Sequence, residues 1–176
     1  MHGKHSLLDP DFVPERELVV HRRDELEELL NSYRGAFSGS SQTYLYGPQG
    51  CGKTLLARLS LQIARDEKGG RPAYVNCWKH RSRADILFEI ADQVCSQTFH
   101  RHSTSRGVVA SALMDEPADS RWVVLDEVSE LKSADVLYDL ARAPELHIVL
   151  VANEPPYILS DADARIRSRI DVGKRI

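Results

Sequence analysis

An α/β fold, with a mostly parallel sheet covered by helices on both faces, is predicted by three features of the 176-residue sequence. Short apolar segments alternate with longer segments of helical periodicity, as in repeated βαβ units. The short segments read as continuous apolar runs, which is expected of strands whose two faces are both buried. Hydrophobic residues make up 42% of the chain, which is ordinary for one globular domain with a core.

The expected elements follow one another in a regular order. Strands are predicted at 43–46, 73–76, 122–125 and 147–152. Helical spacing of apolar residues predicts helices at 22–37, 53–68, 82–97 and 134–142, with a weaker one at 108–114. Ser82 and Asp85 form a capping-box start for the helix at 82–97, and Gly69-Gly70 ends the helix before it. Residues 1–21 contain two prolines and little periodicity, so we expect an extended lead-in there.

Composition excludes several classes of protein. The longest apolar run, 148–152, is too short to span a membrane, and the first residues lack the apolar stretch of a signal peptide. The three cysteines, at 51, 77 and 95, are widely spaced, as in a cytoplasmic protein with reduced thiols. The formal net charge of −3 excludes a protein that is basic overall. We therefore expect a cytoplasmic protein without a membrane partner, whose contacts with nucleic acid would need a local patch.

A phosphate-binding loop is predicted at residues 47–54, because GPQGCGKT satisfies the pattern GxxxxGK[ST] between a strand and a helix. Its glycines let backbone N–H groups approach phosphates at the positive end of the following helix. Lys53 would reach the β- and γ-phosphates, and the Thr54 hydroxyl would hold Mg²⁺. A glycine-rich turn that binds nothing is disfavoured, since the strand and the helix are both in place. The predicted nucleotide-binding residues are Gly47, Pro48, Gln49, Gly50, Cys51, Gly52, Lys53 and Thr54.

Polar residues follow two of the predicted strands. Asp126 and Glu127 come after the strand at 122–125, where Asp126 would hold Mg²⁺ beside Thr54 and Glu127 would act as general base on a water. A solvated acidic loop is the alternative, but the position downstream of the phosphate loop favours a functional role. Asn153 follows the strand at 147–152 and could orient the attacking water or sense the γ-phosphate. Taken alone, it would rather start a turn.

Two basic stretches each have two interpretations. Residues 79–83 could contact a phosphate backbone, although a solvated helix start is favoured. Residues 165–169 could supply a guanidinium to the γ-phosphate of a neighbouring subunit, although composition alone favours a solvated helix end. His100 and His102 flank Arg101 without other ligands at metal-binding spacing, so no metal site is assigned to them.

Taken together, these motifs resemble the base domain of AAA+ ATPases, and in detail the archaeal origin-recognition and cell-division-control initiator family. The resemblance covers roughly residues 12–172. It is carried by the segments 12–18 and 20–26, the phosphate loop, and the segments 74–77, 126–128 and 137–140. It implies a three-layer P-loop NTPase fold for an AAA+ base domain at 22–176, preceded by a lead-in at 1–21 that lines the adenine pocket.

The same resemblance assigns further roles and marks two departures. Val20, His21 and Arg22 would lie near the adenine, Asn153 falls on the sensor-one position, and Arg169 best matches the arginine finger. The chain ends about where the family's fifth strand would begin, so we expect the helical lid, with its sensor-two arginine, and the winged helix to be absent. The stretch at 100–121 is also short for the family's extra DNA-contacting helix.

The predicted function is an ATP·Mg²⁺-binding domain related to replication initiators that hydrolyses ATP slowly. One alternative is a non-hydrolysing module that docks on a full-length initiator. Others are a clamp-loader or transposition-helper ATPase and, least favoured, a small P-loop kinase, since Asp126, Glu127 and Asn153 suit activation of water. Expected partners are ATP or ADP, an AAA+ partner subunit or full-length initiator, and double-stranded DNA, bound weakly without a winged helix.

Overall fold

The centre of the molecule is a sheet of four parallel strands in the order β1-β4-β3-β2. The structure is a computed structural model, and it describes residues 21–34, 42–116, 122–143 and 146–155. The strands are β1 (Gln42–Tyr46), β2 (Ala73–Asn76), β3 (Trp122–Asp126) and β4 (His147–Ala152). Every residue of β3 and β4 is buried, as expected for the inner strands of a covered sheet. The predicted parallel sheet is confirmed.

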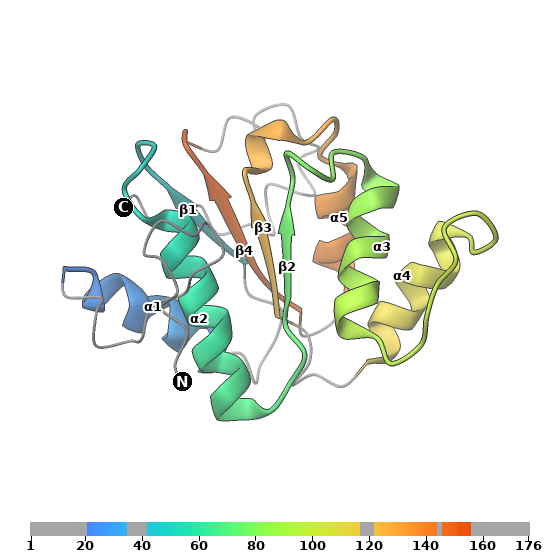
Figure 1. Ribbon diagram of the computed structural model, residues 1–176, viewed down its shortest axis with the longest axis horizontal. Coiled ribbons are helices and arrows are strands. Elements are labelled where there is room, and N and C mark those ends of the chain that lie inside the picture. Colours follow the sequence, from blue (N-terminus) through green and yellow to red (C-terminus); the bar gives the residue numbers. More distant parts are fainter. Residues whose placement is uncertain (1–20, 35–41, 117–121, 144–145, 156–176) are drawn as a thin grey trace, which may run out of the picture.

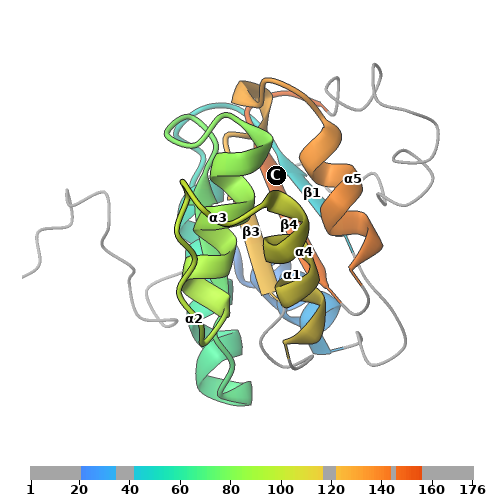
Figure 2. The same ribbon diagram turned by 90° about the vertical axis from the view of Figure 1, so that its right-hand side faces the viewer.

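Helices cover both faces of the sheet and give the three layers seen in Figure 1. One layer holds α1 (Arg23–Arg34) and α2 (Lys53–Lys68), and the other holds α3 (Arg83–Val94), α4 (Arg106–Asp115) and α5 (Asp135–Arg142). In the second layer α4 packs on α3 (Figure 2). Alternate residues of β3 serve the two cores, since Val123 and Leu125 pack with α3 and α5, whereas Trp122 and Val124 pack with α1 and α2. By the same alternation, Asp126 belongs to the α2 face.

Two helix ends lie where the sequence predicted them. Helix α2 ends before Gly69, whose φ of 75° is left-handed and whose N–H donates to the Arg65 carbonyl at 2.7 Å. Helix α3 begins after Ser82, whose Oγ accepts the N–H of Asp85 at 3.2 Å and donates to the Asp85 carboxylate at 2.6 Å. The serine half of the predicted capping box is therefore formed, and the Asp85 carboxylate contacts the Ser82 hydroxyl.

Other boundaries differ from the prediction by two or three residues. Helix α3 ends at Val94 rather than near residue 97, because Cys95 is extended and buried. The N–H of Ser96 then donates to the Glu116 carboxylate at 3.3 Å. Helix α4 begins at Arg106 rather than 108, because Ser105 Oγ accepts the N–H of Val108 at 3.4 Å.

Helix α1 covers residues 23–34 of the predicted 22–37, and residues 35–37 lie outside the described part. Its leucines at 26, 29 and 30 are buried with α2 at helical spacing. None of the described helices is long and apolar enough to cross a membrane.

Candidate nucleotide-binding site

The loop between β1 and α2, residues 47–52, is shaped by glycines with a left-handed backbone. Gly50 has a φ of 79° and Gly52 a φ of 87°, a region that other residues rarely adopt. A Cβ at either glycine would meet nothing within 4 Å, so the constraint is on backbone conformation and not on space. Gly52 precedes α2 without a side chain to cap it, which leaves the first N–H groups of the helix for an anion.

Lys53 is the first residue of α2, and its ammonium group is held by the loop. The residue is only 6% exposed. Its Nζ donates to the carbonyl oxygens of Gly47 at 2.9 Å and Pro48 at 2.8 Å, and lies 3.7 Å from the Cys51 Sγ. A buried charge needs such partners, and phosphate oxygens would be stronger ones because they are themselves charged. The structure thus brings three of the predicted loop residues, Gly47, Pro48 and Cys51, into contact with one ammonium group.

Thr54 and Asp126, which are far apart in the sequence, meet at the carboxyl end of the sheet. Thr54 Oγ1 donates to Asp126 Oδ2 at 2.8 Å, and the aspartate is only 2% exposed. Among the described residues, no group of three His, Cys, Asp or Glu side chains could hold a metal. One carboxylate and one hydroxyl suit Mg²⁺, which usually keeps several waters and takes further oxygens from a nucleotide. The donor set therefore fits Mg²⁺.

Glu127 directly follows this aspartate in an uncommon backbone conformation. Its φ of 55° and ψ of 45° are left-handed, and it is the one described non-glycine residue with a positive φ. Its carbonyl accepts the N–H of Glu130 at 3.0 Å and so opens the short helical turn η4 (Val128–Glu130). The predicted base is thus half-buried beside Asp126, at the start of a tight turn.

The sequence prediction missed Tyr74 on β2. Its hydroxyl donates to Asp126 Oδ2 at 2.6 Å, and the Arg58 guanidinium lies 4.3 Å from the centre of its ring. Burial and the bond to Asp126 raise the pKa of Tyr74 well above its usual range, so the phenol remains a donor. Part of this contact follows from the alternation of side chains along a strand. Once β2 and β3 are known to be neighbours, Tyr74 and Asp126 fall on the same face of the sheet.

The remaining predicted site residues lie after β4, before α1 or outside the described residues. Asn153 follows β4, which lies between β1 and β3, and is exposed. His21 and Arg22 precede α1, where Arg22 lies 3.9 Å from the Glu25 carboxylate. The other two, Val20 and Arg169, lie outside the described residues.

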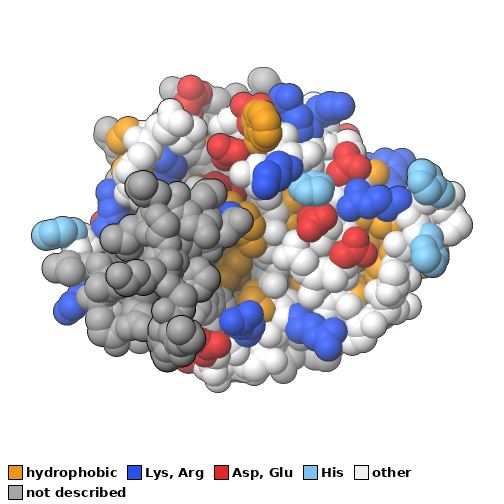
Figure 3. Space-filling model, viewed as in Figure 1, with side chains coloured by type: hydrophobic (Ala, Val, Ile, Leu, Met, Phe, Trp, Pro, Cys, Tyr) orange, Lys and Arg blue, Asp and Glu red, His pale blue; other side chains and the backbone are white. Residues whose placement is uncertain are grey.

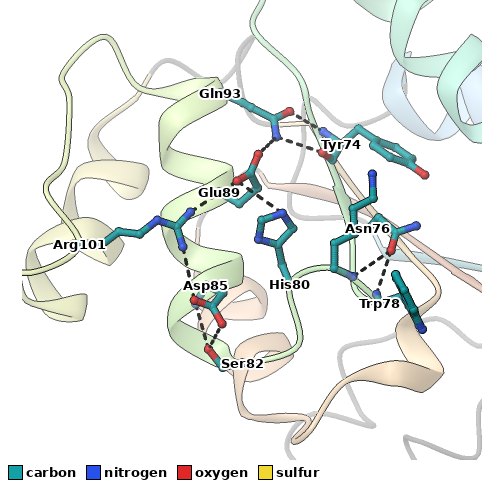
Figure 4. A network of polar contacts seen from close by, with 10 residues as sticks. Tyr74, Asn76, Trp78, His80, Ser82, Asp85, Glu89, Gln93 and Arg101 are labelled. Carbon is teal, nitrogen blue, oxygen red and sulfur yellow. Dashed lines mark hydrogen bonds and ion pairs between the residues drawn. The ribbon is translucent and has the colours of Figure 1, made fainter. Parts of the chain in front are cut away.

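Three basic side chains of the stretch at 79–83 lie close to carboxylates. His80 lies 3.7 Å from the Glu89 carboxylate, and Arg81 pairs with Glu130 at 2.9 Å. The Arg83 guanidinium donates two hydrogen bonds to the Asp139 carboxylate, at 2.5 and 2.6 Å, in a bidentate ion pair. Figure 4 shows His80 and Arg101 on either side of Glu89. On the face seen in Figure 3, Lys and Arg side chains are interspersed with Asp and Glu rather than gathered in one patch.

Comparison with known proteins identifies the family of the chain. A family model described as the AAA ATPase domain matches residues 18–160. The chain belongs to the AAA ATPase family. ORC1-type DNA replication protein 1 of Halobacterium salinarum is 34% identical over 174 residues, 97% of this chain and 56% of the relative. ORC1-type DNA replication protein 9 of that organism is 30% identical over 168 residues, 93% and 47% of the two chains. This AAA domain is therefore related to replication initiators, and it spans about half the length of these relatives.

Solved structures share the fold of this AAA domain. The Aeropyrum pernix ORC2 protein matches with a TM-score of 0.79 at 23% identity, over 96% of this chain and 50% of that chain. Cdc6p from Pyrobaculum aerophilum matches with a TM-score of 0.78 at 24% identity, over 94% and 47% of the two chains. The predicted P-loop NTPase fold is confirmed.

Proposed function

We propose that this AAA domain binds ATP with Mg²⁺ where the 47–54 loop meets Asp126, and that it hydrolyses the nucleotide slowly. The observation that carries the proposal is the 2.8 Å hydrogen bond between Thr54 and Asp126, which joins the phosphate-binding loop to the carboxylate at the end of β3. The Aeropyrum pernix ORC2 protein, which has the same fold, was solved as ADPNP–ADP complexes. ADP would remain in the same loop after hydrolysis.

Each residue of the site has its own chemical role in this proposal. The loop N–H groups and Lys53 would bind the β- and γ-phosphates. Thr54 and Asp126 would hold Mg²⁺, which when bound neutralises charge on the phosphates. Glu127 would accept the proton of the attacking water, and Asn153 would orient that water.

The adenine pocket and the partner subunit are proposed from the family resemblance. Val20, His21 and Arg22 would lie near the adenine base. Arg169 would reach the γ-phosphate bound by another AAA+ subunit or a full-length initiator, where a guanidinium stabilises charge in the transition state. We also propose that the protein is located in the cytoplasm.

Double-stranded DNA is a proposed weak partner. Because His80, Arg81 and Arg83 lie beside carboxylates, the 79–83 stretch has little spare charge for phosphates. Binding should therefore be indifferent to sequence and lost as salt rises to moderate concentrations. A DNA titration at two salt concentrations tests this, and tight sequence-selective binding that survives salt would contradict it.

The fate of γ-labelled ATP distinguishes the proposed activity from its alternatives. Release of free labelled phosphate supports hydrolysis. Retention of intact ATP on the protein would identify a non-hydrolysing module, and a labelled second nucleoside would identify a kinase. Failure of the protein to bind ATP in the presence of Mg²⁺ would contradict the proposal as a whole.

A further inference from the structure

The Asp126 carboxylate receives more donors than the sequence motif supplies. Thr54 Oγ1 and Tyr74 Oη both donate to Oδ2, at 2.8 and 2.6 Å, and the Glu127 N–H donates to Oδ1 at 2.9 Å. An ionised carboxylate offers about four lone-pair sites, shared equally by its oxygens. Within the described part of the chain, these donors fill both sites on Oδ2 and one on Oδ1. A single site on Oδ1 is left open.

Tyr74 is held in this position from several sides. The Gln93 side chain accepts the Tyr74 N–H at 2.9 Å and donates to the Tyr74 carbonyl at 3.0 Å, which covers the outer edge of β2 (Figure 4). The Arg58 guanidinium lies over the ring, one turn of α2 beyond Thr54. With its backbone and ring both contacted, the phenol is pre-organised to donate to Asp126 rather than to water.

We infer that Tyr74 is a positioning residue, which fixes the rotation of the Asp126 carboxylate so that one lone pair on Oδ1 stays open to Mg²⁺ or to one of its waters. The inference rests on the proposed function, because it concerns the same metal site. Because the Thr54 hydroxyl donates its hydrogen to Oδ2, the lone pairs of Oγ1 remain available to the metal. Removal of a hydrogen-bond donor that orients a metal ligand commonly lowers the affinity for the metal.

The number of open lone-pair sites on the Asp126 carboxylate influences which divalent cation binds there. Mg²⁺ requires a near-octahedral shell and few carboxylate oxygens, whereas Ca²⁺ takes more oxygens and accepts a carboxylate through both. A carboxylate limited to one open site favours contact through a single oxygen. Removal of the Tyr74 hydroxyl would free a site on Oδ2 and let the carboxylate turn, so the preference for Mg²⁺ over Ca²⁺ should fall.

The test is equilibrium binding of a fluorescent ATP analogue to the full chain in Mg²⁺, in Ca²⁺ and in EDTA. Tyr74→Phe keeps the ring beneath Arg58 and removes only the hydroxyl. We expect the affinity in EDTA to stay within about twofold of the parent, while the enhancement by Mg²⁺ falls roughly tenfold and the Mg²⁺-to-Ca²⁺ ratio shrinks. Tyr138→Phe is the matched control, since Tyr138 is also half-buried beneath an arginine, Arg142 at 5.6 Å, on the opposite face of the sheet. It should behave like the parent.

A second variant separates positioning from a general structural effect. If Tyr74 acts through Asp126, Tyr74→Phe should add nothing to the loss caused by Asp126→Asn. A parental Mg²⁺ enhancement in Tyr74→Phe, or a full further loss in the double variant, would overturn the inference. A parent that binds no ATP would instead contradict the proposed function.

Discussion

At the scale of single residues, Glu127 combines an unfavourable backbone with a proposed chemical role. A left-handed conformation costs a non-glycine residue about 1–2 kcal/mol. Glu127 nevertheless adopts a φ of 55°, and the turn that it opens is closed by the N–H of Glu130. Residues in such conformations cluster at functional sites, where the surrounding structure enforces them. The strain therefore supports the chemical role that the sequence predicts for Glu127.

Replacement of Glu127 separates ATP binding from hydrolysis. Glu127→Gln keeps the size and the hydrogen bonding of the side chain but removes the base. We expect near-parental ATP affinity with hydrolysis lowered by roughly a hundredfold or more. Phosphate release and analogue binding, measured on the same preparation, check this. Unchanged hydrolysis would mean that another group takes the proton.

The site residues differ in how far the sequence could predict them. Lys53, Thr54 and Asp126 follow from motifs, because phosphate and metal chemistry demands those residue types between particular elements. Tyr74 could not be predicted in the same way. Its hydroxyl meets Asp126 because β2 lies next to β3, and strand neighbours are a property of the folded chain. Residues that act through tertiary contacts therefore remain hidden in a single sequence.

At the scale of elements, apolar periodicity predicted the helices and strands, and tertiary contacts determined several of their ends. Helix α3 ends at Val94 because the buried Cys95 is extended, although the residues that follow do not exclude a longer helix. The start of α3 was predictable, because a serine cap is encoded locally. Local chemistry therefore predicts a boundary better than periodicity does.

Loss of the α3 cap should lower stability. Ser82→Ala removes the oxygen that accepts the Asp85 N–H and should reduce the free energy of unfolding by about 1 kcal/mol. Urea denaturation should show a lower midpoint with an unchanged slope. Ser103→Ala, at an exposed serine in the loop before α4, is the control and should leave the midpoint near the parental value. An equal loss in both variants would contradict the capping role.

At the scale of the whole molecule, the strand order brings the chemical groups to one end of the sheet. The phosphate loop follows β1, Asp126 ends β3, and Asn153 follows β4, which lies between them. Carboxyl ends of parallel strands meet at one edge, where α/β proteins bind their ligands. The parallel sheet itself was predictable from buried apolar strands, whereas the order β1-β4-β3-β2 is supplied by the structure.

The stability of the whole domain should fall in mild acid because of His147. This histidine begins β4, is 3% exposed, and burial lowers its pKa from 6.5 to about 4. Between these two values the unfolded chain binds a proton that the folded chain does not. The contribution of His147 to stability is therefore complete well above pH 6.5 and is lost as pH falls toward 4, at a cost of at most about 3 kcal/mol.

Urea denaturation across this pH range checks the role of His147. In His147→Leu the decline should be much shallower than in the parent, whereas the exposed His102→Gln should follow the parent. The comparison between variants removes the contribution of the carboxylates that titrate nearby. Equal slopes in all three proteins would show that His147 is not the group responsible.

Binding of ATP at the 47–54 loop is tested most directly by titrating a fluorescent ATP analogue, with Mg²⁺, against the parent and Lys53→Ala. Loss of the buried ammonium removes the charge-assisted bonds to two anionic phosphates, so affinity should fall by roughly a hundredfold or more. Lys132→Ala, at an exposed lysine beyond η4, should bind like the parent. Near-parental affinity in Lys53→Ala would contradict the assignment of this loop as the nucleotide site.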